Sequence, residues 1–130
     1  MSGRHKAALI LTALGCVVLL AGATLHVIEG YPRVVSGGTG SNLSPGLQSA
    51  FRTVFLLVGW DWILAGIIVL IGSFSATKLG KAIVLICGLS LLGHTAIMVH
   101  FLGWFVGAQM IFAAGLLVIC GGALLQPASA

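Results

Sequence analysis

The chain has 130 residues, of which 59% are hydrophobic and only 6% are charged. Because soluble domains carry about 25% charged residues, this composition excludes a soluble globular protein, and lipid must cover most of the surface. The formal net charge at pH 7 is +4, but the six basic residues are scattered at the ends of apolar runs, which excludes the basic stripe typical of nucleic-acid-binding proteins. The length permits a single domain, 1–130.

Four apolar segments predict four transmembrane helices, because a helix needs roughly 20 apolar residues to cross a bilayer. In chain order, they span about 7–28, 46–73, 82–102 and 105–125. Ser44 and Pro45 favour a helix start at the second segment, since serine is a good N-cap residue and proline suits the first turn. The polar stretch 29–45, rich in glycine and serine, is predicted to be a loop. The predicted fold class is an all-α, integral membrane four-helix bundle whose last two helices form a tight hairpin.

The positions of lysine and arginine predict the orientation, because cytoplasmic loops of membrane proteins are enriched in these residues. Arg4 and Lys6 precede the first helix, while Lys78 and Lys81 border the short connection between the second and third helices. We therefore expect the N- and C-termini to be cytoplasmic and the loop 29–45 to lie on the outer side of a bacterial inner membrane. Cleavage of the first helix as a secretory signal is an open alternative, since this helix combines a basic start with a small-residue site.

Small residues recur every seven positions in three of the predicted helices. The series are Ala8, Gly15 and Gly22 in the first helix, Gly59, Gly66 and Ser73 in the second, and Gly107, Ala114 and Gly121 in the fourth. Because seven residues make nearly two helical turns, each series forms a stripe along which helices can pack closely in lipid. If the first two helices pack along their stripes, Glu29 and Arg52 meet at the outer end as an ion pair. The alternative is that both side chains extend separately to water.

Asp61 is the most unusual residue of the chain, because it lies near the middle of the second predicted helix. An ionisable group at the centre of a bilayer costs on the order of 3 kcal/mol or more, so such residues mark functional sites. His94 is its best partner in the chain, since the two lie about 16 Å and about 12 Å from the outer ends of their helices. We expect an intramembrane Asp61–His94 pair, which could relay a proton, bind a quinone carbonyl or a metal, or simply be structural.

A second group of polar residues is predicted at the outer ends of the helices: His26, Glu29, Arg52 and His100. His26 and Glu29 are three positions apart, on one side of a helix, and with His100 they would provide three ligands for a zinc ion. Polar helix ends are the simpler interpretation, so no metal site and no catalytic residue is assigned. The sequence identifies no cofactor, and it contains no phosphate-binding loop, no paired carboxylates and no catalytic triad.

The layout of the chain consists of a lone first helix, an outer loop, a second helix entered at Ala50-Phe51-Arg52 and followed by glycines, and a closing hairpin. This layout resembles the DoxX-like group and related small, uncharacterised bacterial four-helix membrane proteins. The resemblance is one of architecture, covers the whole chain and implies no functional residues.

The sequence predicts a small, non-enzymatic integral membrane protein, either an accessory subunit or a small-molecule-binding bundle. Asp61 has few partners in its own chain, so we expect its carboxylate to pair with a group from another membrane chain or from a second copy of this protein. Two alternatives stay open: a quinone- or redox-linked protein that uses Asp61 and His94, and a small proton-coupled transporter with Asp61 as the carrier carboxylate. The lipid bilayer is an expected partner, and nucleic acid is not.

Overall fold

The computed structural model covers the whole chain, and the structure describes residues 3–39, 42–75 and 77–127. These residues form α-helices and one π-helix, with no strand among them. In chain order the helices are α1 (Gly3–Leu25), the π-helix η1 (His26–Gly30), α2 (Tyr31–Thr39), α3 (Pro45–Phe74), α4 (Lys78–Leu102) and α5 (Val106–Leu124). Four stretches are long and apolar enough to cross a membrane: Gly3–Gly37, Pro45–Phe74, Lys78–Leu102 and Val106–Leu124. The architecture is that of an all-helical, multi-pass membrane protein.

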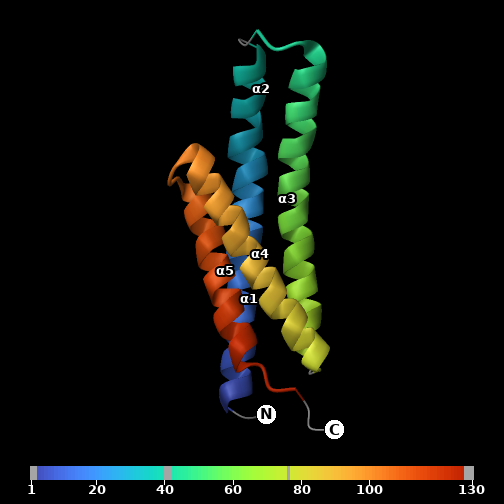
Figure 1. Cartoon of the computed structure of the whole chain (residues 1–130), viewed down its shortest axis with the longest axis vertical. Helices are drawn as coiled ribbons and strands as arrows, with labels where there is room; N and C mark the ends of the chain where they lie inside the picture. Colours follow the sequence, from blue (N-terminus) through green and yellow to red (C-terminus); the bar gives the residue numbers. More distant parts are fainter. Residues whose placement is uncertain (1–2, 40–41, 76, 128–130) are drawn as a thin grey trace.

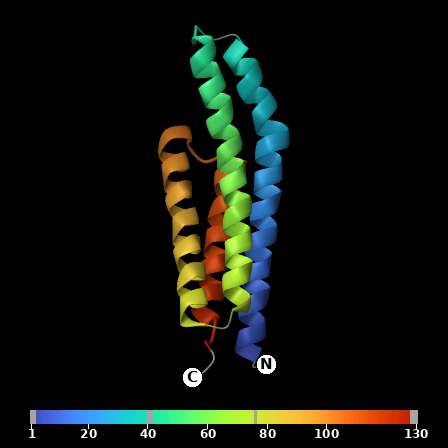
Figure 2. The same ribbon diagram turned by 90° about the vertical axis from the view of Figure 1, so that its right-hand side faces the viewer.

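The segments α1, η1 and α2 form one long rod, against which α3 and α5 pack, while α4 packs on α3 and α5 (Figure 1). α3 runs antiparallel to this rod along most of its length, and α4 and α5 form a shorter hairpin beside them (Figure 2). α2 and the beginning of α3 project beyond this hairpin as a two-helix arm, which we define as 31–39 and 45–54. The start of α1 and the end of α5 lie together at the opposite end, which we call the base.

The arm replaces most of the loop that the sequence predicts over 29–45. The helix continues to Thr39, and among the described residues of this stretch only 42–44 lie outside helices; positions 40–41 are outside the described part of the chain. The loop prediction was wrong because glycine and serine content reflects a local preference for turns, whereas α2 packs against α3 along the arm. Tertiary packing of this kind routinely overrides local propensity.

The π-helix η1 lets the rod continue past a proline. The N–H of Tyr31 donates to the carbonyl of His26, five positions back, which widens the turn. In a regular α-helix, the ring of Pro32 would crowd the carbonyl of Ile28, and Pro32 has no N–H to donate. A π-turn directly before the proline relieves this conflict, and such turns are frequent at functional positions of helices.

Side chains cap the first turns of α3 and α4. Ser44 caps α3 as predicted: its hydroxyl accepts from the N–H of Leu47 at 3.4 Å, and Pro45 occupies the first turn. Thr77 caps α4 in the same way, accepting from the N–H of Gly80 at 2.9 Å. This cap starts α4 four positions earlier than the apolar run alone predicts, because the capping hydroxyl satisfies a backbone donor of the first turn.

The α4–α5 hairpin is defined by one glycine turn and one lysine contact. The turn 103–105 joins the helices, and Gly103 has φ of 73°, which glycine adopts without strain. The predicted tight hairpin is thereby confirmed. At the base, Lys81 Nζ donates to the carbonyl oxygens of Ala123 and Leu125, both at 3.0 Å. A cation at this place stabilises the carbonyl end of α5.

The small-residue stripe of α1 packs against α5. A Cβ on Gly15 would lie 2.8 Å from Val118 Cγ2 and 3.2 Å from the carbonyl oxygen of Ala114. A Cβ on Gly121 would lie 2.9 Å from the backbone nitrogen of Thr12. Glycine at these positions allows the two backbones to approach closely, so the stripe of the first helix faces α5, and the condition under which Glu29 and Arg52 would pair is not met.

The stripe of α3 faces α1 instead, across larger side chains. A Cβ on Gly66 would lie 3.8 Å from Leu19 Cδ2, and one on Gly59 would lie 3.3 Å from His26 Cδ2. α1 therefore has α5 on one side, through contacts between small residues, and α3 on the other, where its own side chains fill the space left by the glycines of α3.

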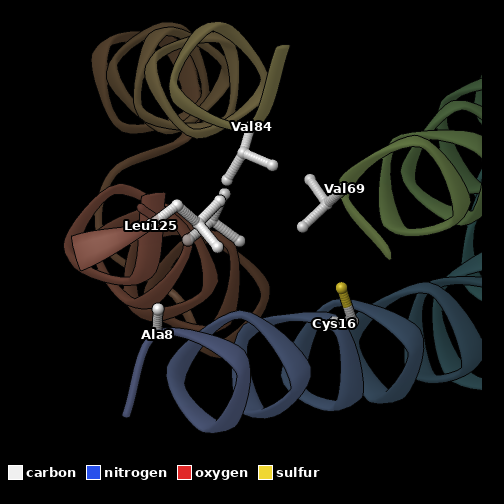
Figure 3. Close-up of a cluster of buried hydrophobic side chains, with 6 residues drawn as sticks. Ala8, Cys16, Val69, Val84 and Leu125 are labelled. Carbon is white, nitrogen blue, oxygen red and sulfur yellow. The ribbon is translucent and has the colours of Figure 1, made fainter. Parts of the chain in front are cut away.

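Two clusters of buried side chains fill the bundle. The cluster near the base contains Ala8, Cys16, Val69, Val84, Val118 and Leu125, whose side chains converge from the four spans and from the residue that follows α5 (Figure 3). The other cluster contains Leu19, Ala23, Trp62, Leu91, Ile111 and Ala114. Because each cluster draws residues from all four spans, the four helices form one packed bundle, and the arm extends from it.

Candidate functional site

The site is organised by a close contact between α3 and α4 near the base. A Cβ on Gly72 would lie 3.0 Å from the carbonyl oxygen of Gly80 and 3.0 Å from Val84 Cγ2. It would also lie 3.6 Å from Ile83 Cγ2. Glycines at positions 72 and 80 thus allow the backbones to touch here. From this contact, α4 leans away from α3 as both approach the hairpin end of the bundle (Figure 1).

Asp61 and His94 lie on the helix faces that meet at this contact. Asp61 precedes Gly72 by eleven positions, and His94 follows Ile83 by eleven positions. Eleven residues make three helical turns, about 16 Å, so each residue lies almost directly in line with its counterpart at the contact. Counted from Gly80, the closer contact, His94 lies fourteen positions further on, about 21 Å, so helical geometry puts the two residues within about one turn of each other in depth, on the sides of α3 and α4 that meet at the contact.

Both side chains are exposed. No hydrogen bond or ion pair joins Asp61 to His94, and neither side chain has such a partner elsewhere in the described part of the chain. The expected pair within one chain is thus not formed there. The physical reason is the lean of α4, which begins at the close contact between Gly72 and Gly80 (Figure 1).

We call the surface around these two residues the α3–α4 face. It is defined by Asp61, Ala65 and Ile68 of α3 and by Ser90, His94 and Ile97 of α4. An apolar hollow of about 190 Å³ lies at its foot, with Ile68 and Ile83 among its lining residues. In a membrane this face presents one carboxylate, one imidazole and one hydroxyl to an otherwise apolar surrounding, where a hydrogen bond meets little competition from water.

His26, the first residue of η1, packs its side chain against α3. Its Nε2 donates to the carbonyl oxygen of Phe55 at 2.8 Å, since that oxygen can only accept. The imidazole stacks on the Phe55 ring, with centroids 3.7 Å apart and planes 11° apart. Gly59 makes room for the imidazole, because any side chain there would press against His26 Cδ2. His26 therefore joins η1 to α3 and is not part of an outer cluster.

Trp62 and Phe55 complete this contact, and sequence reasoning misses both. Trp62 is 2% exposed, and its ring centroid lies 4.9 Å from that of His26. Its Nε1 is buried without a hydrogen-bond partner among the described residues. The available signal is the spacing of Phe55, Gly59, Trp62 and Gly66 by four, three and four positions, which marks the side of a helix that packs on a neighbour.

The predicted outer-face cluster is not assembled. Glu29 forms an exposed ion pair with Arg33, with Oε2 and Nη2 3.4 Å apart. Because the helix continues into the arm, Arg33 lies one turn from Glu29 and takes the place expected for Arg52. Arg52 is half-buried on α3, and its Nε is buried without a hydrogen-bond partner among the described residues. His100 is exposed near the end of α4, with its ring edge-on to Phe101 at 4.7 Å between centroids.

Across residues 3–39, 42–75 and 77–127, no three or more His, Cys, Asp and Glu side chains are grouped so that they could hold a metal ion. The zinc alternative for His26, Glu29 and His100 therefore has no geometric support in this part of the chain. His26 in particular is already engaged by Phe55 through its Nε2.

The fold and the site define a class: an all-helical, multi-pass membrane protein with an acid and a base exposed on facing sides of two spans. Comparison with protein-family models, with curated proteins and with solved structures gives no match for this chain. What the protein does must therefore be inferred from its own residues.

Proposed function

We propose that the protein is a non-enzymatic accessory subunit of the bacterial inner membrane, which binds another membrane chain through the α3–α4 face. One observation carries this proposal. The carboxylate of Asp61 is exposed in the middle of a helix long enough to span a membrane, and no hydrogen bond or ion pair to it forms in the described part of the chain.

The energetics favour a partner at this place. An ionisable group near the bilayer centre costs on the order of 3 kcal/mol or more unless it is paired. Hydrogen bonds between membrane helices contribute about 1–2 kcal/mol in model peptides, and close packing of side chains adds to this. A partner chain that offers a hydrogen-bond donor to Asp61 would offset much of the cost, so association is more favourable than exposure to lipid.

The two alternatives have less support from the geometry. A quinone- or redox-linked function uses Asp61 and His94 as one pair, and no hydrogen bond or ion pair joins the two side chains in the described part of the chain. A carrier carboxylate needs access from both sides of the membrane, whereas Asp61 is exposed on the outside of the bundle and lines no described pocket. A chain that meets Asp61 from outside the bundle requires neither arrangement.

The distribution of basic residues supports a cytoplasmic base. Lys78 and Lys81 lie at the start of α4, next to the end of α5, and Arg4 and Lys6 lie at the start of α1. The positive-inside rule puts such an end in the cytoplasm. We therefore propose that both ends of the chain are cytoplasmic and that the arm lies on the outer side.

The test compares three proteins gently extracted from their own membrane: the wild type, Asp61→Asn, and the matched control Glu29→Gln. Native mass spectrometry measures the fraction of each protein that is bound to another chain. We expect a complex for the wild type and the control, and an affinity about tenfold lower for Asp61→Asn, since about 1.4 kcal/mol of hydrogen bonding is lost. A wild type that is monomeric in every mild detergent would contradict the proposal.

A further inference from the structure

We infer that the chain that covers the α3–α4 face is a second copy of this protein, related to the first by a twofold axis along the membrane normal. This inference rests on the proposed function and names its partner. In the dimer, Asp61 of each copy pairs with His94 of the other copy.

Similar depth is the first observation that favours a second copy. Asp61 lies about three turns from Gly72, and His94 lies three to four turns from Ile83 and Gly80, so their depths agree within about one turn. A twofold axis along the membrane normal rotates a copy without changing the depth of any residue. Two groups can therefore pair reciprocally across such an axis only if their depths match, and these two groups meet this condition.

Charge complementarity is the second observation. The rotation places α3 of one copy opposite α4 of the other, so an acid faces a base in both halves of the interface. An imidazole N–H can donate to a carboxylate whether the ring is neutral or charged. Two side chains that are exposed and unpaired within the described part of one chain thus both gain a partner from a single symmetric contact.

The side chains around the pair suit an interface between membrane helices. Ile68 and Ile97 are exposed and apolar, so they can exclude water from the paired groups. Ala65 and Ser90 are small, which lets helices of two copies approach closely. The hollow of about 190 Å³ at the foot of the face gives room for a side chain of the other copy.

The test reverses one charge in each of two differently tagged copies, Asp61→His and His94→Asp. In a dimer of Asp61→His alone, two histidines face each other across each half of the interface, and in a dimer of His94→Asp alone, two aspartates do. We expect the dimer fraction of each variant to fall at least tenfold below that of the wild type. Co-expressed, the two variants restore both acid–base pairs, and we expect a heterodimer that co-purifies through either tag. Native mass spectrometry in mild detergent gives the mass of each species.

The matched control is His100→Asp, which adds the same charge to α4 outside the α3–α4 face. We expect it to leave the wild-type dimer intact and not to rescue Asp61→His. If a reversal variant fails to insert, the milder Asp61→Asn and His94→Gln replace it. Each should raise the dimer dissociation constant about tenfold, and the double variant should be no worse than either single one, because both changes break the same pairs.

The outcomes separate this inference from the proposed function. A wild-type dimer that both reversal variants form equally well would overturn the inference. A complex of one copy with a different chain that is lost in Asp61→Asn would overturn the inference that the partner is a second copy. The same result would support the proposed function. A wild-type monomer that carries only lipid or another small molecule would overturn both.

Discussion

Histidines in this bundle have different surroundings, and His26 has the most specific one. Its imidazole packs against α3, donates to the carbonyl of Phe55 at 2.8 Å and stacks on the Phe55 ring. It can enter this position because Gly59 opposite has no side chain. By contrast, His100 is exposed near the end of α4 and touches a ring edge. One residue type thus stabilises the bundle at one position and contributes little at the other.

We therefore expect His26→Ala to destabilise the bundle by about 2 kcal/mol, since it removes a stacked ring pair worth roughly 0.5–1.5 kcal/mol and a hydrogen bond of similar size. His100→Ala is the matched control, and its effect should stay within about 0.5 kcal/mol because the residue is exposed. Unfolding in mixed detergent micelles, followed by tryptophan fluorescence, measures both values. Equal effects of the two variants would contradict the role given to His26.

At the scale of the elements, glycine stripes decide which helices touch. The heptad spacing in α1 predicts a stripe, and Gly15 and Gly121 do bring backbones close together, but between α1 and α5. Periodicity within one helix identifies a face, whereas the choice of neighbour depends on how the faces of all helices fit. The sequence could likewise predict the cap at Ser44, which is local, but not the helix in the arm, which depends on packing against α3.

The α1–α5 contact gives a paired test. In Gly121→Ala, the new Cβ would lie 2.9 Å from the backbone nitrogen of Thr12 and 3.0 Å from the carbonyl oxygen of Ala8, so the helices must separate. We expect a loss of about 2 kcal/mol of stability, as for other overpacked cores. Gly93→Ala is the control, since nothing lies within 4 Å of its Cβ position, and alanine favours helix by up to about 1 kcal/mol. The same unfolding assay should show a loss for the first variant only.

At the scale of the whole molecule, the number of spans follows from hydropathy, because each apolar run is nearly a helix by itself. The candidate site is less accessible to sequence reasoning. Counting residues along each helix gives the depth of Asp61 and His94 and the helix face on which each one lies, because both depend only on the regular rise and rotation per residue. The lean of α4 away from α3 depends on the contact of Gly72 with Gly80, which no pattern within one helix encodes. Whether the acid and the base meet within one chain therefore depends on how the helices pack, which the sequence of one helix does not encode.

The orientation of the whole molecule is open to a direct test, because the arm and the base lie at opposite ends (Figure 1). With the base in the cytoplasm, Gly37→Cys in the arm should react with a membrane-impermeant maleimide added to intact cells, since a Cβ there meets open space. Lys78→Cys at the base should react only after the membrane is permeabilised, because lysine-rich ends stay inside. The wild type measures the background from its own cysteines, of which Cys120 is exposed but lies within a span. The opposite labelling pattern would place the arm inside, and the subunit would then present the α3–α4 face to a partner in the inverse orientation.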